Sequence, residues 1–161
     1  MKISPTALLA TIRLNLIRRP LITTDTAEDC LDVSPRSLLA MIEQGKIFWA
    51  WDFGSRGTRK EIRILAHSVV EQITGPFPAI GATKNLNLPE VVGLILPQTR
   101  ESMRGAELQR LFHVSTGLIN KLSRTGEIKR IPENLPKTGP NASPRFKRAS
   151  LVKLLEKRRI V

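Results

Sequence analysis

Cysteine, histidine and tyrosine are scarce in this chain of 161 residues, and their scarcity excludes several kinds of site. A single cysteine, Cys30, permits neither an intramolecular disulfide nor a cysteine-based zinc site. The two histidines, His67 and His113, stand in no spacing that suits metal ligation. With no tyrosine, the chain lacks the nucleophile of a tyrosine recombinase. We therefore expect no cofactor and no metal, and we interpret Cys30 as a small buried hydrophobe.

Long apolar runs and familiar active-site motifs are also missing. No run approaches the roughly 20 apolar residues of a transmembrane helix. Near the N-terminus, Arg18 and Arg19 follow the apolar stretch 7–17, which reverses the order of a signal peptide. The sequence has no glycine-rich phosphate loop with lysine and no G-x-S-x-G elbow. These absences predict a cytoplasmic protein that contacts no membrane and is not an enzyme.

Acidic residues are too few to balance the basic ones. The chain has 26 lysines and arginines against 14 acids, so its formal net charge is +12. Residues 21–75 contain six bases and eight acids, whereas residues 101–161 contain fourteen bases and five acids. A surplus of this size predicts a polyanionic partner, without distinguishing DNA, RNA and anionic lipid. The last third of the chain is where we expect that partner to bind.

What the chain does have is an internal repeat, visible when residues 21–73 are written above residues 102–155. The offset is 81 residues, and it becomes 82 after one inserted residue. We interpret the two segments as copies of one unit. The matched segments are LDVS at 31–34 with FHVS at 112–115, GKI at 45–47 with GEI at 126–128, and RI at 63–64 with RF at 145–146.

Each copy predicts two short helices, a β-hairpin and a closing helix. Ser34 and Ser115 are placed to cap the second helix, and Gly45 and Gly126 to end it. Two short helices joined by a tight turn form a helix-turn-helix. The predicted bounds, first copy before second, are 24–30 and 104–111 for the first helix, 35–44 and 116–125 for the second, 47–53 with 61–64 and 128–131 with 144–147 for the strands, and 68–73 and 150–158 for the last helix.

This pattern resembles the winged helix-turn-helix domains of the MerR and excisionase-like family. The resemblance rests on AEDCLDVS at 27–34, on GKI at 45–47, on the basic segment RGTRK at 56–60 and on RI at 63–64. It covers residues 21–73 well and residues 102–158 less well. It implies a mainly α fold with small β-hairpin wings, in two tandem winged helix-turn-helix units. The second copy departs from the pattern by Gly117 inside its second helix and by a long, proline-rich wing.

The expected organisation has four parts. An N-terminal helix, whose apolar side either packs on the first unit or forms a dimer contact, precedes that unit. The apolar run 91–96 lies between Pro89 and Pro97, and we expect a buried strand or a partner contact there. The parts are 1–20 for the N-terminal helix, 21–75 for the first unit, 76–100 for a linker with an apolar strand, and 101–161 for the second, basic unit.

Double-stranded DNA is the partner that the family resemblance implies. The second helix of each unit would enter the major groove, where arginine suits guanine and asparagine suits adenine. Wing residues would contact the phosphate backbone or the minor groove. The candidate DNA-binding residues are Arg36, Ser37, Arg56, Arg59, Lys60, Thr116, Asn120, Lys121, Arg124, Lys129, Arg130, Arg145 and Lys147.

The sequence thus predicts a sequence-specific DNA-binding accessory or regulatory protein, located at the nucleoid. The resemblance allows both an excisionase-like architectural factor and a transcriptional repressor, and the sequence does not choose between them. An RNA-binding protein is one alternative, although the chain lacks the aromatic pairs that stack on single-stranded bases. A protein-interaction adaptor of a recombination or replication complex is another, because the first unit carries more acids than bases. A homodimer and a recombinase or replication partner both stay open.

Overall fold

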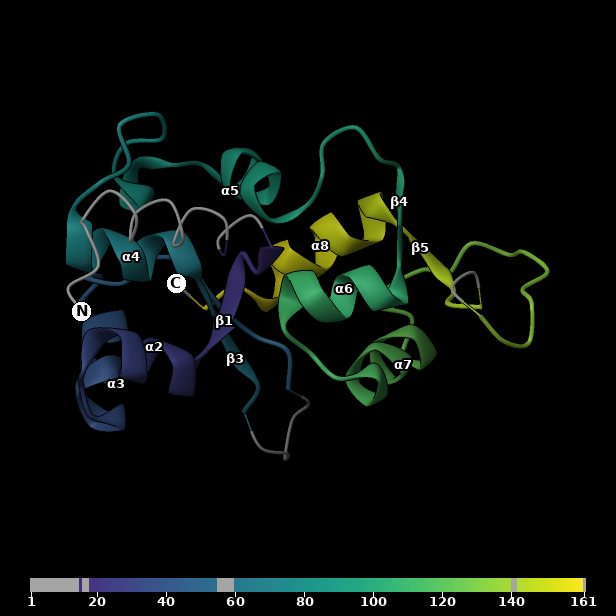
Figure 1. Ribbon diagram of the computed structural model, residues 1–161, viewed down its shortest axis with the longest axis horizontal. Coiled ribbons are helices and arrows are strands. Elements are labelled where there is room, and N and C mark those ends of the chain that lie inside the picture. Colours follow the sequence, from purple (N-terminus) through teal and green to yellow (C-terminus); the bar gives the residue numbers. More distant parts are fainter. Residues whose placement is uncertain (1–14, 16–17, 55–59, 140–141, 161) are drawn as a thin grey trace, which may run out of the picture.

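The computed structural model describes residues 15, 18–54, 60–139 and 142–160. Within this part, seven α-helices and one short 3₁₀ helix (η1) accompany small antiparallel sheets (Figure 1). The elements are β1 (Leu21–Thr23), α2 (Thr24–Leu31), α3 (Pro35–Glu43), β2 (Ala50–Asp52), β3 (Ile62–Leu65), α4 (Ala66–Thr74), η1 (Thr83–Asn85), α5 (Leu88–Ile95), β4 (Ser102–Arg104), α6 (Gly105–Phe112), α7 (Thr116–Arg124), β5 (Arg145–Lys147) and α8 (Arg148–Arg158).

The same order of elements occurs twice along the chain. The elements β4, α6 and α7 begin 81 residues after β1, α2 and α3, and α8 begins 82 residues after α4. The residues that close α2 and α6, Asp32 and His113, both adopt the left-handed conformation with φ of 52°. This mixed α/β architecture, helices with small antiparallel sheets, is compatible with a winged helical fold.

The sheets follow one pattern in both halves. In the first, β3 lies between β1 and β2, and both neighbours are antiparallel to it. In the second, β5 pairs with β4 and makes a single bridge to Arg130 on its other side. Backbone hydrogen bonds from Ile131 N to Arg145 O and from Lys147 N to Lys129 O, both 2.8 Å, extend that contact. The predicted outgoing strand 128–131 is therefore reduced to a short bridge.

Local signals account for the second helix of each half. The hydroxyls of Ser34 and Ser115 accept hydrogen bonds from the backbone N–H groups of Ser37 and Leu118. Such a side chain satisfies one of the N–H groups that a helix leaves free at its start. The glycines that follow, Gly45 and Gly126, have φ of 68° and 77°, a conformation that glycine adopts without strain. Serine before and glycine after thus fix the length of α3 and α7.

One hydrophobic core joins the two halves. It contains Trp51 and Phe53 of the first half together with Phe112 and Leu155 of the second. The Trp51 indole N–H donates to the Leu155 carbonyl at 2.8 Å, and the rings of Phe53 and Phe112 stack with centroids 5.5 Å apart. Because buried aromatic pairs are close-packed, the halves are held as one body. A smaller cluster around Ile42 and Ile64 fills the first half alone.

The apolar run between the two halves is a helix, and the predicted strand at 91–96 is wrong. Asn87 and Glu90 form a reciprocal capping box at the start of α5. That box supplies partners for two backbone N–H groups, which favours a helix over an extended segment. Val91, Val92 and Ile95 are buried against the shared core, so the expectation of burial is confirmed.

Other boundaries differ from the sequence-based expectation. The short strands β1 and β4 were not predicted, because their partners β3 and β5 lie some forty residues further along the chain. The closing helices α4 and α8 begin two residues before Ser68 and Ser150. Both serines are buried, and each hydroxyl donates to a carbonyl three residues earlier at 2.7 Å.

Two further expectations concern Cys30 and the N-terminal helix. Cys30 is exposed, so the prediction that it is buried is wrong. Helix α2 turns Ala27 toward the core with Leu31 beside it, and Cys30 falls at the edge of that inner face. The N-terminal helix lies mostly outside the described residues. None of the helices that the structure describes combines the length and the apolar character needed to span a membrane.

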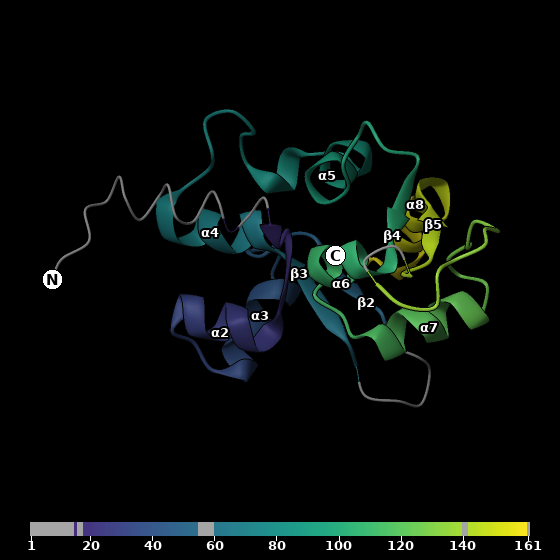
Figure 2. The ribbon, with the colours of Figure 1, turned by 45° about the vertical axis from the view of Figure 1, so that its right-hand side comes forward.

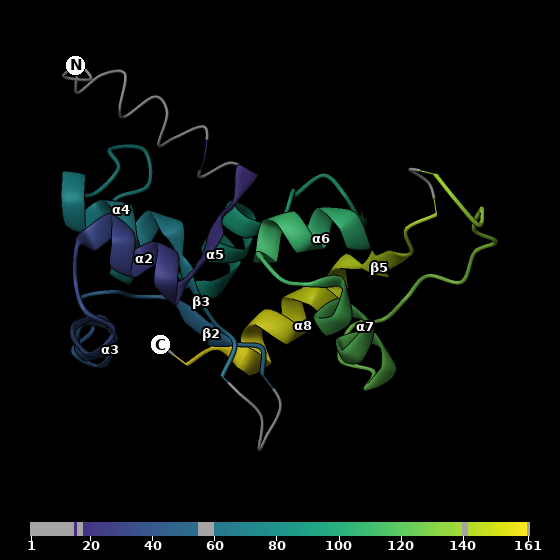
Figure 3. The ribbon, with the colours of Figure 1, turned by 60° about the horizontal axis from the view of Figure 1, so that its bottom comes forward.

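The second helices of both halves lie on one side of the molecule. Helix α3 lies toward one end of the long axis and α7 toward the other, both in the lower half of the view, while α5 lies above (Figure 1). The same relation holds after rotation about the vertical axis (Figure 2). With the lower side brought forward, α3 and α7 again lie apart, with α8 extending between them (Figure 3).

Candidate nucleic-acid interface

Helix α7 presents a polar face outward. Ile119 and Leu122 are buried, whereas Thr116, Asn120 and Arg124 are exposed. These three positions are four residues apart, so they form one stripe along the helix. Within the described part of the chain, no hydrogen bond or ion pair occupies the side chains of this stripe. Helix α7 therefore offers amide, hydroxyl and guanidinium groups to a ligand at no cost in internal contacts.

Helix α3 occupies the matching place in the first half but has a different outer face. Leu39, 47% exposed, stands where α7 has Asn120, and Glu43 stands where α7 has Arg124. The predicted contact residues Arg36 and Ser37 are exposed at the start of the helix. The Ser37 hydroxyl already accepts a hydrogen bond from Ser34 at 2.9 Å. Arg36 is thus the one base on α3.

The predicted wing residues divide into described and undescribed positions. Arg56 and Arg59 lie outside the described residues, and Lys60 is exposed beside them. In the second half, Lys129, Arg130 and Lys147 are exposed on the two paired segments at 129–131 and 145–147. The fourth candidate there, Arg145, is half-buried and donates to the Ser102 hydroxyl at 3.2 Å. The structure therefore exposes three of the predicted basic residues on neighbouring segments, whereas the fourth, Arg145, is hydrogen-bonded within the fold.

Several other arginines serve the structure itself. Arg63 is buried, and its Nε donates to the His113 carbonyl at 2.8 Å, which ties β3 to the turn after α6. Arg100 pairs with Glu107 at the start of α6. Arg158 donates through Nη2 to Glu127 at 2.6 Å and also contacts the Gly54 carbonyl. These guanidinium groups hold elements together, so they are not free to bind a ligand.

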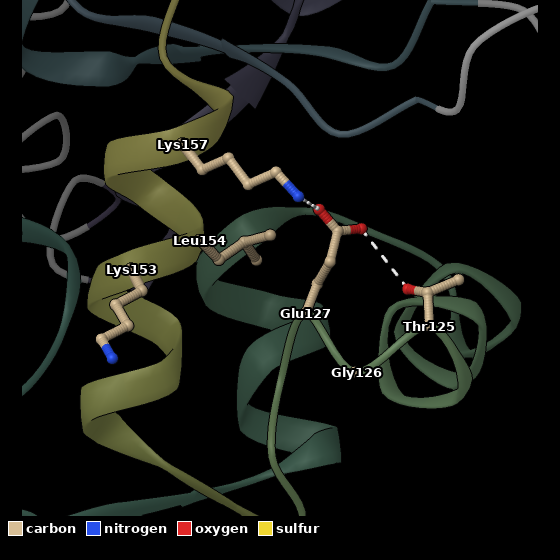
Figure 4. A pocket seen from close by; sticks show the side chains of 6 residues that line it. All are labelled: Thr125, Gly126, Glu127, Lys153, Leu154 and Lys157. Carbon is tan, nitrogen blue, oxygen red and sulfur yellow. Dashed lines mark hydrogen bonds and ion pairs between the residues drawn. The ribbon is translucent and has the colours of Figure 1, made fainter.

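A small cavity of about 260 Å³ between the end of α7 and α8 illustrates this structural use of charge (Figure 4). Its carboxylate, Glu127, contacts Lys157 at 3.3 Å, and the Lys153 side chain points away from it. The hydrogen bond from Arg158 holds the pKa of Glu127 below its ordinary value, against the opposing effect of burial. The cavity lies where α7 and α8 meet, and its carboxylate, Glu127, is already paired with two basic side chains.

His67 is the buried histidine of the described residues. The His67 ring is buried against the edge of Phe77, with centroids 5.4 Å apart, and burial lowers its pKa. Across the described ranges, no three His, Cys, Asp or Glu side chains gather as metal ligands would. His67 is therefore a neutral core residue at physiological pH.

Residues missed by the sequence-based reasoning line a cleft of about 430 Å³ beside the start of α7. They include Arg19, Gln109, Arg110 and His113. The repeat could have identified Gln109, Arg110 and His113, because these three residues match acids of the first half. Comparison with protein-family models, with curated proteins and with solved structures finds no match for this chain.

Proposed function

We propose that this protein is a sequence-specific double-stranded DNA-binding factor of accessory or regulatory kind, built from two tandem winged helix-turn-helix units. The observation that carries the proposal is the outer face of α7. Thr116, Asn120 and Arg124 form an exposed stripe, and none of them is engaged within the described structure. An α-helix fits the major groove, where asparagine pairs with adenine and arginine with guanine through two hydrogen bonds each.

The lysine and arginine side chains around α7 supply the contacts to the DNA backbone that a helix in the major groove needs. Lys129 and Arg130 lie on the segment before the long tip of the second unit, and Lys147 lies on the paired segment after it. In this proposal they contact phosphates, which fix the register of the helix without reading sequence. The charge surplus of residues 101–161 supports the same assignment.

The first unit contributes less to base reading in this proposal. Arg36 is its one basic side chain on α3, and the apolar Leu39 and the acidic Glu43 offer no hydrogen-bond donor to phosphates. Lys60 and its neighbours at the hairpin tip would add backbone contacts. Because α3 and α7 share a side of the molecule, a single duplex passing along that side would meet both (Figures 1 and 2).

A variant series tests the proposal directly. We expect wild-type protein to bind duplex DNA, measured by fluorescence anisotropy, with an affinity that falls steeply as salt rises. Asn120→Ala and Arg124→Ala each remove one base-reading contact, worth about 1–3 kcal/mol for the preferred sequence. The matched controls are Leu39→Ala and Glu43→Ala on α3, which leave binding unchanged or slightly stronger. Equal affinity of all four variants for every duplex would contradict the proposal.

A protein-docking role for the first unit is the second candidate, and it rests on Leu39. This side chain is 47% exposed at a position where α7 carries a polar residue. The centre of a protein interface is enriched in apolar side chains, and its rim is polar. Leu39→Ala, which leaves the charge of α3 unchanged, would weaken binding of such a partner without changing DNA affinity, and this separates the two roles.

A further inference from the structure

A basic cleft lies where the chain entering β1 meets the turn between α6 and α7. Its volume is about 430 Å³. Arg110 comes from the exposed side of α6, and Arg19 precedes β1 and is also exposed. Gln109 and His113 complete the polar lining, and no acid is among the lining residues that the structure describes. The described wall of the cleft is therefore positive or neutral throughout.

The internal repeat shows that this charge is not a requirement of the fold. Helices α2 and α6 have equal length, and each is followed by a residue in the left-handed conformation. Yet the positions that carry acids on α2 are occupied on α6 by alanine, glutamine and arginine. The matched pairs are Asp25 with Ala106, Glu28 with Gln109, Asp29 with Arg110, and Asp32 with His113. Since one backbone accepts either set, the fold does not impose the replacement of these acids by neutral and basic residues in the second unit.

We propose that this cleft binds a phosphate group of the DNA backbone at the edge of the major groove read by α7. Arg19 and Arg110 contact the phosphate oxygens, because the planar guanidinium group matches a phosphate with two parallel N–H donors. This inference rests on the function proposed above and adds two residues to it. A phosphate held beside Ser115, where α7 begins, would set the depth and register at which α7 enters the groove.

His113 provides a reporter inside the cleft. Burial and the positive charges of Arg19 and Arg63 lower the pKa of His113. Arg110 lies on the same wall, and Glu61 pairs with Arg63 at 3.2 Å. A bound phosphate opposes this positive field, so it raises the pKa of His113 and draws a proton onto the ring. By linkage, DNA affinity rises as pH falls through the pKa that His113 has in the complex.

The first experiment measures affinity and salt dependence for duplex DNA. Arg110→Ala and Arg19→Ala should each weaken binding roughly three- to tenfold for every sequence and reduce the salt slope by about one. Asp29→Ala, at the position that matches Arg110 in the first unit, is the control and leaves affinity unchanged or higher. The thermal midpoint of Arg110→Ala should equal that of the wild type, because Arg110 is exposed and makes no side-chain contact recorded in the described structure.

The second experiment follows the imidazole signals of the two histidines by NMR. A short duplex should shift the His113 signals and raise its pKa, while His67, buried in the first turn of α4, is the internal reference. Arg110→Ala should remove the shift. Inorganic phosphate, compared with chloride at equal ionic strength, shows whether the cleft takes free phosphate instead of DNA.

The outcomes separate this inference from the proposed function. If wild-type protein binds DNA but Arg19→Ala and Arg110→Ala bind equally well with an unchanged His113 signal, the cleft is not a phosphate site and the DNA-binding proposal stands. If wild-type protein binds no duplex, both proposals fail. A His113 shift with free phosphate but not with duplex overturns the DNA assignment of the cleft.

Discussion

At the scale of single residues, the arginines of this protein fall into two groups: those whose guanidinium groups bind other parts of the fold, and those that are exposed. Arg63, Arg100 and Arg158 contact carboxylates or carbonyls of neighbouring elements. Arg124 and Arg110 are exposed, with no contact recorded for them in the described structure. Composition alone counts both groups equally toward the charge of +12. The division can be seen only when the fold shows which bases have an acid or a carbonyl within reach.

Glu127 gives a prediction at this scale. Replacing it, Glu127→Gln, should lower the free energy of unfolding by about 1–3 kcal/mol, since hydrogen bonds to a charged, largely buried group are lost. The pKa of this carboxyl is held below its ordinary value of 4.5 in the folded protein. The stabilisation is therefore complete above that value and is lost as pH falls through the lowered, folded-state pKa.

Urea unfolding of both proteins at several pH values checks this prediction. The difference in unfolding free energy should be largest near neutral pH and shrink in acid. As a control, Glu133→Gln changes an exposed carboxylate for which the described structure records no contact, so its effect should stay within about 0.5 kcal/mol. A pH-independent difference for Glu127→Gln would contradict the assignment.

At the scale of elements, the serine caps should contribute equally in both halves. Ser34→Ala and Ser115→Ala each remove a side chain that accepts from a free backbone N–H. Each should lower the unfolding free energy by about 1 kcal/mol. Thr116→Ala, one residue after the second cap, is exposed and should leave stability unchanged. Thermal or urea unfolding measures all three, and a much larger loss at one cap than at the other would contradict their equivalence.

The elements also show what the sequence could predict. Helices α3 and α7 were found because serine, the apolar spacing and glycine are local signals. Strands β1 and β4 were missed, because a three-residue strand has no periodicity of its own and depends on a distant partner. The run at 91–96 belongs to a helix and not to the predicted strand, because the Asn87–Glu90 capping box and Pro89 in the first turn favour a helix start. The cleft at Arg110 could not be predicted, because it forms where the turn between α6 and α7 meets the chain before β1. Sequence spacing does not show that these two segments lie together.

At the scale of the whole molecule, the shared core ties the two halves into one cooperative structure. Trp51 packs in the first half and donates to Leu155 in the second. The chain end returns to the first half as well, where Ile160 N donates to the Ala50 carbonyl at 2.8 Å. Neither half can unfold without exposing apolar surface of the other.

Coincident unfolding curves would verify this cooperativity. Both tryptophans, Trp49 and Trp51, are buried in the shared core, so their fluorescence reports that core, whereas far-UV circular dichroism reports the helices of both halves. In urea the two probes should give one midpoint and one free energy. Two separated transitions would mean that the halves unfold independently.

Selection from a pool of random duplex DNA at near-physiological salt, followed by sequencing, tests sequence-specific DNA binding. Wild-type protein should enrich a motif, and Asn120→Ala and Arg124→Ala should lose the preference at particular base pairs of that motif. Salt-sensitive binding without any enriched motif would contradict sequence-specific binding, because the charge of the second unit would then act as an unspecific electrostatic attraction.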